Sequence, residues 1–306
     1  MNKSKYIITI DTESDNAWNF PERIRMKNFE GIKKFQYLCE EYSIIPIYLL
    51  TYEYATNIEA IKFLNEKIRK NKCKIGYHFH AWSTPPFQNE KNGVDMDWLN
   101  AYQYELPDKL FYEKVNKLYS AIVNNFNVKP IIHRAGRYGI DQRSIDWMID
   151  KEFRVDTSVV PYINMSNNKG KSLSGNDFIS YNNEIFLWNH SKKNKEIIEI
   201  PVSTIFPKYI NNNFLYNKYI KKFCNKFGYA KMLRPYPNCI KINRKIINYL
   251  VSRRKIVNVM LHSSELSLNC SPYTLTNKDM NYIWKAIIDI FSIIRDENLG
   301  HYSINK

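Results

Sequence analysis

The chain has 306 residues, a formal net charge of +15 and a hydrophobic fraction of 44%. This apolar content supports a large core and excludes a mostly disordered chain, and no stretch approaches the roughly 18 apolar residues of a membrane span. Lysine and arginine are spread along the sequence, together with abundant Asn, Ile and Tyr. We therefore interpret the charge as a compositional bias and expect no nucleic-acid partner.

The cysteines and the start of the chain predict a location. The five cysteines are scattered and show no CxxC spacing, which is typical of proteins from a reduced compartment. The apolar run that follows the basic first residues is too short for a secretory signal. We therefore expect a cytoplasmic protein.

Seven apolar, β-branched runs, taken in chain order, predict strands at residues 6–10, 44–50, 73–79, 130–133, 153–156, 196–202 and 256–261. Apolar residues recur at helical spacing in residues 58–68, 110–126 and 277–295. This strand–helix alternation predicts an α/β barrel of parallel strands with helical crossovers. Residues 161–195 and 209–239 fit the alternation less well, and we interpret them as irregular insertions in one domain that spans residues 1–306.

Titratable residues follow several of the predicted strands. The first strand leads directly into Asp11, Glu13 and Asp15, and the third ends in His78 and His80. Because side chains on a strand alternate with period two, the three carboxylates are expected on one face, where a divalent cation would relieve their repulsion. Chemistry in such barrels collects at the carboxyl ends of the strands. The pattern therefore predicts a metal site with mixed nitrogen and oxygen ligands.

Five segments in this order resemble the motifs of the NodB-type polysaccharide deacetylases, the carbohydrate esterases of family four. They are TIDTESD, IGYHFHAW, HRAGRYG, VDTSV and VMLHSSEL. The longer stretches IGYHFHAWSTPPF, DTSVVP and EIPVSTIF are most like the WalW-like subgroup. The resemblance runs from Ile7 to about Leu266 and implies a distorted (β/α)7 barrel of the NodB-homology type.

The resemblance implies one divalent metal ion, held by Glu13, His78 and His80. Zinc is the expected ion, with cobalt, nickel or iron as alternatives. The chain departs from the usual family pattern, because its acidic residues are not adjacent and its two histidines are two residues apart, with Trp82 at the later position. Asp15 is therefore an alternative ligand to Glu13. A hydrogen-bonded histidine pair beneath an aromatic cluster is the structural alternative to a metal site.

The resemblance also implies roles for four further residues. Asp11 is the expected general base, and Arg134 would keep it ionised; the alternatives are a second metal ligand for Asp11 and a structural ion pair for Arg134. His262 is the expected general acid that protonates the leaving amine. Asp156 is its expected carboxylate partner, or else a cap or turn residue.

Trp82, Arg137 and Tyr138 are expected to bind substrate, and Trp18 also lies beside a motif. Aromatic rings stack on sugar faces, although they also simply fill cores. We expect a metal-dependent hydrolase that removes an N- or O-acetyl group from a carbohydrate, such as a glycan, a sugar precursor or a nucleotide-sugar, in surface-polysaccharide biosynthesis or modification. A non-catalytic glycan-binding barrel and a hydrolase of another C–N bond, such as a cyclic amide, are the alternatives.

Overall fold

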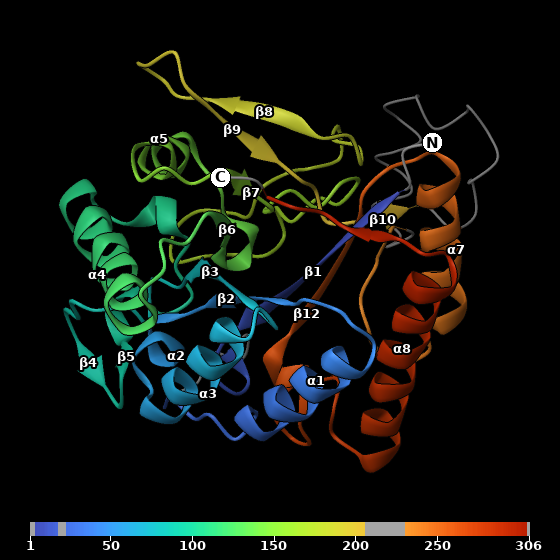
Figure 1. The fold of residues 1–306 in the computed structure, drawn as a ribbon. Coiled ribbons are helices and arrows are strands. Elements are labelled where there is room, and N and C mark those ends of the chain that lie inside the picture. Colours follow the sequence, from blue (N-terminus) through green and yellow to red (C-terminus); the bar gives the residue numbers. More distant parts are fainter. Residues whose placement is uncertain (1–3, 18–22, 206–229, 305–306) are drawn as a thin grey trace.

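Seven parallel strands form the centre of the molecule in a computed structural model that describes residues 4–17, 23–205 and 230–304 (Figure 1). Their order in the sheet is β12-β1-β2-β3-β6-β7-β9, and β8 adds an antiparallel strand at the β9 edge. The strands are β1 (Lys5–Thr12), β2 (Ile47–Leu50), β3 (Lys74–Phe79), β6 (Ile132–Ala135), β7 (Val155–Asp156), β8 (Phe186–Asn189), β9 (Glu196–Glu199) and β12 (Val257–His262). The short β13 (Gly300–His301) pairs with the start of β1. All seven predicted strands are present, and the predicted distorted (β/α)7 barrel is confirmed.

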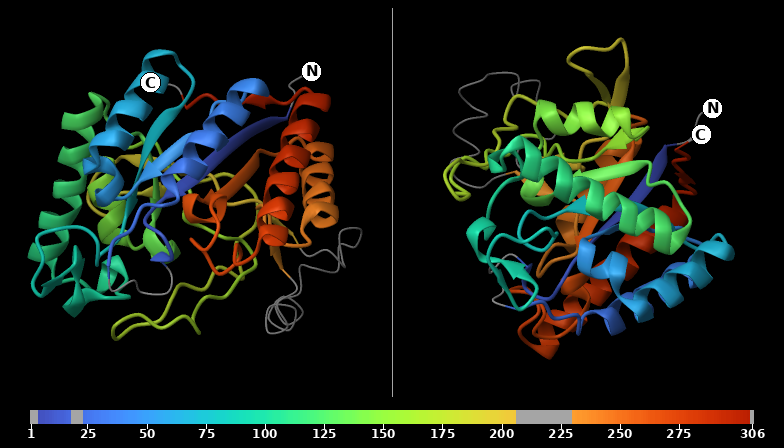
Figure 2. Two further views of the ribbon diagram at one scale, coloured as in Figure 1. Left: turned by 90° about the horizontal axis from the view of Figure 1, so that it is seen from below. Right: turned by 90° about the vertical axis from the view of Figure 1, so that its left-hand side faces the viewer.

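Helices cover the outside of the curled sheet, as Figures 1 and 2 show. They are α1 (Phe29–Glu41), α2 (Tyr52–Thr56), α3 (Ile58–Arg69), α4 (Asp108–Phe126), α5 (Gln142–Asp150), α7 (Ile240–Ser252) and α8 (Asn277–Asp296). The predicted helical stretches correspond to α3, α4 and α8. Among the described residues, no helix is both long and apolar enough to span a membrane.

Short elements decorate this frame. Two short antiparallel strand pairs were not predicted: β4 (Glu90–Lys91) with β5 (Val94–Asp95), and β10 (Thr204–Ile205) with β11 (Lys231–Met232). One-turn helices occur at η2 (Met96–Trp98), η3 (Gln103–Glu105), η4 (Gly136–Tyr138) and η6 (Ser263–Leu266). The predicted insertion at 161–195 is irregular apart from β8. Of the second predicted insertion, 209–239, residues 209–229 lie outside the described residues. The assignment of a single domain stays a prediction.

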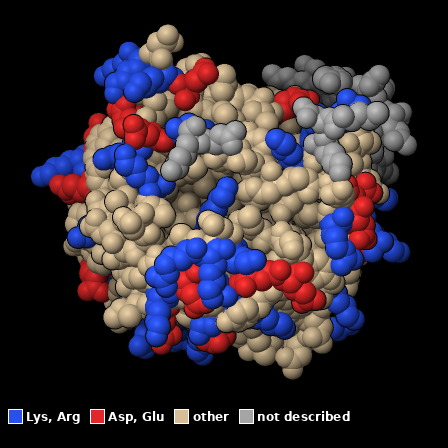
Figure 3. Space-filling view, viewed as in Figure 1, with Lys and Arg blue, Asp and Glu red and all other residues tan. Residues whose placement is uncertain are grey.

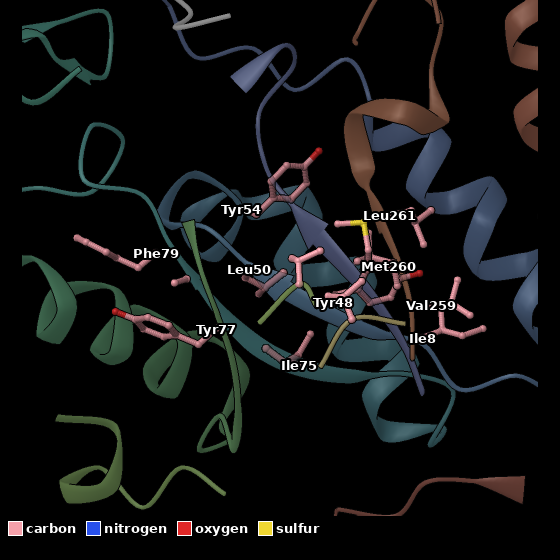
Figure 4. Packing of buried hydrophobic residues seen from close by; sticks show 14 of the residues in the cluster. Ile8, Tyr48, Leu50, Tyr54, Ile75, Tyr77, Phe79, Val259, Met260 and Leu261 are labelled. Atoms are coloured by element: carbon pink, nitrogen blue, oxygen red, sulfur yellow. The ribbon is translucent and has the colours of Figure 1, made fainter. Parts of the chain in front are cut away.

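Strand residues alternate between a helix-covered outer face and an enclosed inner face. Ile8, Tyr48, Ile75 and Val259 belong to the large core cluster that includes the helices (Figure 4). A smaller cluster lies on the other face, and it includes Ile7, Ile47, Leu49, Ile132, Val155 and Ile200. Each fully buried large apolar side chain stabilises the fold by about 1.5–3 kcal/mol. Since Ile7 faces inward, period two also directs Thr9 and Asp11 inward.

The two edges of the parallel sheet are joined by a short segment after β9. The side chain of Asn258, on β12, is fully buried and donates to the carbonyl oxygens of Ile200 (3.0 Å) and Pro201 (3.1 Å). Ser203 N donates to Asn258 O (3.2 Å), and Ser203 Oγ accepts the backbone N–H of Asn258 (2.8 Å). These bonds close the barrel where regular strand pairing stops.

Charged side chains are distributed over the surface. On the face shown in Figure 3, Lys and Arg side chains are interspersed with Asp and Glu. A nucleic-acid-binding surface would instead gather basic side chains into a patch or stripe. The interpretation of the net charge as compositional stays a prediction.

Candidate active site

A cavity of about 540 Å³ lies at the carboxyl ends of the strands, where the sequence predicted the chemistry. Its walls include Asp11, Glu13, His78, His80 and His262. Strand register explains this convergence, because Asp11 on β1 is the direct neighbour of His262 on β12 in the parallel ladder. The structure therefore brings together predicted residues that are as much as 251 positions apart in the sequence, from Asp11 to His262.

The predicted metal ligands form one buried cluster. Glu13 Oε2 lies 3.4 Å from His80 Nε2 and 3.8 Å from His78 Nε2, and the two imidazole nitrogens are 3.0 Å apart. The candidate ligand atoms of all three residues lie within 4.8 Å of one another. Two imidazole nitrogens and a carboxylate oxygen that converge in this way match the ligand set of a catalytic zinc site.

Hydrogen bonding around the cluster fits a bound cation. His78 Nδ1 is 2.8 Å from Arg134 O, and because a carbonyl oxygen only accepts, Nδ1 carries a proton and Nε2 is the nitrogen that faces the cluster. Burial and neighbouring His78 lower the pKa of His80 well below its ordinary value, which keeps that ring neutral. Glu13 Oε1 is buried and has no hydrogen-bond partner among the described residues. These three residues therefore fit a divalent metal ion.

A glycine lets the next strand approach this cluster. A Cβ atom on Gly136 would lie 2.3 Å from Phe79 O and 2.6 Å from His80 Cδ2. Both distances are far shorter than van der Waals contact, so any larger residue at this position would displace the side chain of His80, a candidate metal ligand. Only glycine, which has no Cβ atom, allows the backbone to approach His80 this closely.

Asp15 is placed away from the cluster, contrary to the expectation that three carboxylates share one face. Its two carboxylate oxygens accept the backbone N–H groups of Lys27 and Asn28, each at 3.0 Å. The reason is that β1 ends at Thr12, so strand alternation does not extend to Asp15. The geometry favours Glu13 over Asp15 as the acidic ligand.

Asp11 and Arg134 form a buried ion pair in the barrel interior. Arg134 Nη1 donates to Asp11 Oδ1 at 2.7 Å, and its other nitrogens donate to Thr9 Oγ1 (2.6 Å) and Thr157 O (3.0 Å). Burial opposes the charge of Asp11, but Arg134 and the nearby histidines hold the pKa of its carboxyl below the ordinary value. Asp11 is therefore ionised at neutral pH, and its Oδ2 lies 3.9 Å from His78 Nε2.

His262 faces Asp11 across the cavity. Its Nε2 lies 3.7 Å from Asp11 Oδ2. On the other side of the ring, Nδ1 lies 3.4 Å from Arg234 Nη2 and 3.8 Å from Glu265 Oε2. The residues beside Nδ1 are thus an arginine and a glutamate that sequence reasoning did not assign to the site.

Asp156 is bonded elsewhere, which corrects its predicted pairing with His262. Its Oδ1 lies 2.6 Å from His133 Nδ1, and His133 is its direct neighbour in the β6–β7 ladder. Val155 belongs to the inner cluster, and so alternation turns Asp156 to the outer face, whereas the side chain of His262 points inward. Asp156 also accepts from the backbone and hydroxyl of Ser158, as a turn residue does.

The predicted substrate residues have different surroundings. Trp82 is 3% exposed and stacks on His80, with ring centroids 4.3 Å apart. Its ring therefore packs against the candidate metal ligand His80 and leaves little exposed surface for contact with a sugar. Arg137 and Tyr138 line the cavity, both with left-handed backbone (φ 55° and 58°). Such conformations cost about 1–2 kcal/mol each and cluster at functional sites. Trp18 lies outside the described residues.

The 161–195 insertion also reaches the cavity. Met165, Asn168 and Lys169 form part of its wall. Arg137 Nη2 donates to Lys169 O at 2.8 Å, which ties the insertion to the motif beside the site. The insertion thus shapes one side of the opening.

Comparisons with known proteins agree on the fold. No protein-family model matches the chain, and no curated protein sequence matches it. Among solved structures, a 4-α-glucanotransferase from Thermococcus litoralis is similar over 99% of this chain and 40% of its own, with a TM-score of 0.58 and 9% identity. This chain thus spans two-fifths of the length of that protein.

A candidate polysaccharide deacetylase from Mycobacterium smegmatis is similar over 100% of this chain and 95% of its own, with a TM-score of 0.52 and 10% identity. A family 4 carbohydrate esterase from Streptomyces lividans, solved with acetate, has a TM-score of 0.46 and 7% identity over 99% of this chain and 93% of its own. At such identities the comparisons establish the fold alone: this chain is a curled α/β barrel of the kind found in the Mycobacterium smegmatis protein.

Proposed function

We propose that this protein is a metal-dependent hydrolase that removes an N- or O-acetyl group from a carbohydrate. The observation that carries the proposal is the convergence, in one cavity, of a buried Glu–His–His cluster with an arginine-paired aspartate and a histidine. An acyl-transfer hydrolase needs such a set, because water must be activated on one side of the carbonyl and the leaving group protonated on the other. A cavity of about 540 Å³ is large enough for a sugar unit.

Glu13, His78 and His80 would hold one divalent ion, zinc first, with cobalt, nickel or iron as alternatives. When bound, that ion supplies Lewis acidity for activating water and polarising the acyl carbonyl. Asp11 remains ionised beside Arg134 and receives the proton of the attacking water on Oδ2, the oxygen that Arg134 Nη1 does not bond. His262 Nε2 faces the same space, so a proton on Nε2 meets the leaving nitrogen or oxygen.

Substrate contacts and biological setting follow from the same hypothesis. Arg137 and Tyr138 line the opening and would contact the sugar, while Trp82 would support His80. Membership of the WalW-like subgroup, a role in surface polysaccharides and a cytoplasmic location stay predictions.

The first test is the metal content of the chain, measured by elemental analysis on protein purified without chelators or metal-affinity resin. We expect about one divalent ion per chain in the wild type and none in His78→Ala. His262→Ala should keep the ion and lose acetate release from acetylated oligosaccharides. A wild-type protein that binds no metal even on titration would refute the proposal, and binding to glycan arrays without turnover would then indicate a glycan-binding barrel.

A further inference from the structure

One wall of the cavity belongs to residues 165–176 of the insertion, which we call the rim loop. Three residues of this loop line the cavity: Met165, Asn168 and Lys169. The loop folds back on itself as an irregular hairpin, in which Met165 N donates to Asn176 O (2.9 Å) and Gly175 N donates to Asn168 O (3.0 Å). These bonds give the loop its shape, whereas contacts with the rest of the barrel must fix its place beside the cavity.

The tip of the rim loop lies on the carboxylate of Glu105, the last residue of η3. Glu105 Oε1 accepts the backbone N–H groups of Ser172 and Leu173, both at 2.6 Å, and the hydroxyl of Ser172 at 3.2 Å. Glu105 Oε2 accepts the backbone N–H groups of Lys171 (3.0 Å) and Tyr102 (2.6 Å). One carboxylate group therefore binds three consecutive backbone amides of an exposed loop.

The charge of Glu105 and the residue above it both fit this contact. Burial opposes the charge, but the backbone N–H groups hold the pKa of the Glu105 carboxyl below its ordinary value, so it is ionised at neutral pH. Hydrogen bonds to a carboxylate are about twice as strong as those between neutral groups. A Cβ atom on Gly170 would lie 2.3 Å from Glu105 Oε2, so a larger residue there would push the loop away from the carboxylate.

Tyr102 connects the tip of the loop to the cavity. Its ring is buried and lines the cavity, and its hydroxyl donates to Asn168 O at 2.8 Å. The guanidinium of Arg137 lies 4.2 Å from the centroid of this ring and donates to Lys169 O. The rim loop is thus bound at its tip by Glu105 and along the cavity wall by Tyr102 and Arg137.

We propose that Glu105 is a positioning residue that holds the rim loop in place as a wall of the cavity and so sets the affinity for the carbohydrate. The inference rests on the proposed function, because the carbohydrate is the ligand that this wall would contact. Glu105 is not among the described residues that line the cavity, so it acts through the loop. A wall that contacts the ground state and the transition state equally lowers KM and does not raise kcat.

Amide hydrogen exchange on the full chain tests the contact without any need for turnover. In Glu105→Gln the amide keeps one accepting oxygen, but its NH₂ group meets the N–H groups that the other oxygen bound. We expect exchange in peptides that cover Lys171–Leu173 to accelerate by at least about tenfold, since loss of one charge-assisted hydrogen bond shifts local opening by this much. Gly170→Ala, which leaves Glu105 unchanged, should have the same effect.

Glu90→Gln is the matched control. Glu90 also accepts a backbone N–H, from Gly93 at 2.7 Å, but it lies in the exposed β4 and is not among the described residues of the cavity wall. This variant should leave exchange at Lys171–Leu173 unchanged. Wild-type exchange of these amides in Glu105→Gln would overturn the proposal, and Gly170→Ala provides the same test if Glu105→Gln does not fold.

Steady-state kinetics with acetylated oligosaccharides test the consequence for binding. We expect Glu105→Gln to raise KM about tenfold and to change kcat by less than about twofold, and Glu105→Asp, which keeps the carboxylate, to recover part of the loss. A fall in kcat at constant KM, or a freed loop with an unchanged KM, would overturn the role in binding. If the wild type releases no acetate, the proposed function fails, whereas the exchange result still decides whether Glu105 holds the loop.

Discussion

The buried pair of Arg134 and Asp11 makes a strong prediction for the variant Arg134→Met. The guanidinium is fully buried and donates to Asp11, Thr9 and the carbonyl of Thr157. Methionine fills a similar volume but donates nothing, so the carboxylate of Asp11, which is 2% exposed, loses its cation. Removal of one partner from a buried ion pair costs about 3–5 kcal/mol. A domain is stable by only about 5–15 kcal/mol, so the variant should lie near the limit of folding.

The effect should depend on the charge of Asp11, which a double-mutant cycle measures. Asp11→Asn removes the charge and keeps an acceptor for Arg134, and the double variant Asp11→Asn/Arg134→Met contains neither charge. We expect the double variant to be more stable than Arg134→Met alone, with a coupling energy of at least about 2 kcal/mol. The assay is urea denaturation at pH 7, and Arg244→Met, at an exposed pair, should cost about 1 kcal/mol or less.

The pH dependence gives a second check on the same pair. Burial alone would raise the pKa of Asp11, but Arg134 and the histidines lower it overall in the folded protein. The pair therefore stabilises the fold fully above the unfolded pKa of about 3.9, and this contribution is lost as the pH falls through the lower folded pKa. Additive energies in the cycle, or a destabilisation by Arg134→Met that does not shrink in acid, would refute the reasoning.

Three further predictions concern single carboxylates and one lysine. Glu13→Gln should abolish metal binding, as measured by elemental analysis. Asp15→Asn should keep the ion but lower the free energy of unfolding by about 1–2 kcal/mol, because it weakens the bonds from Asp15 to two backbone N–H groups. Loss of the ion in Asp15→Asn and its retention in Glu13→Gln would make Asp15 the ligand. Lys114→Met should cost about 3–5 kcal/mol in urea denaturation, because Lys114 and Asp95 form a fully buried pair at 2.9 Å; a loss below about 1 kcal/mol would contradict this. Burial and a neighbouring carboxylate raise the pKa of Glu199 well above its ordinary value, so the folded state keeps a proton that the unfolded chain releases above about pH 4.3. The contribution of Glu199 to the free energy of unfolding should therefore decrease as the pH rises above about 4.3, by up to about 1.4 kcal/mol per pH unit. Glu199→Gln should remove this pH dependence from the free energy of unfolding.

The sequence by itself determined the strands of the barrel and the main members of the site. The run from Tyr6 to Ile10 is apolar at every position except Thr9, and such a nearly continuous apolar run is a local property of a buried parallel strand. The carboxyl ends of parallel strands all lie at the same end of the barrel. Polar residues at these strand ends must therefore lie near one another, and they include Asp11, His78 and His262. Fold and cluster could therefore be predicted without any knowledge of long-range contacts.

The tertiary structure alone decided which side chains face one another. Asp15 is lost from the cluster because β1 stops at Thr12, and the exact end of a strand depends on its neighbours. Asp156 turns away from His262 because it lies on the opposite face of its strand.

The partners of His262 illustrate the same limit. Glu265 is only three residues away and could have been suspected from the helix-cap spacing, but Arg234 comes from another part of the chain. Local patterns determine which residues are strand ends and which faces are apolar. Pairing across the barrel is set by register, strand length and the route of the loops, and these depend on the packing of the whole chain.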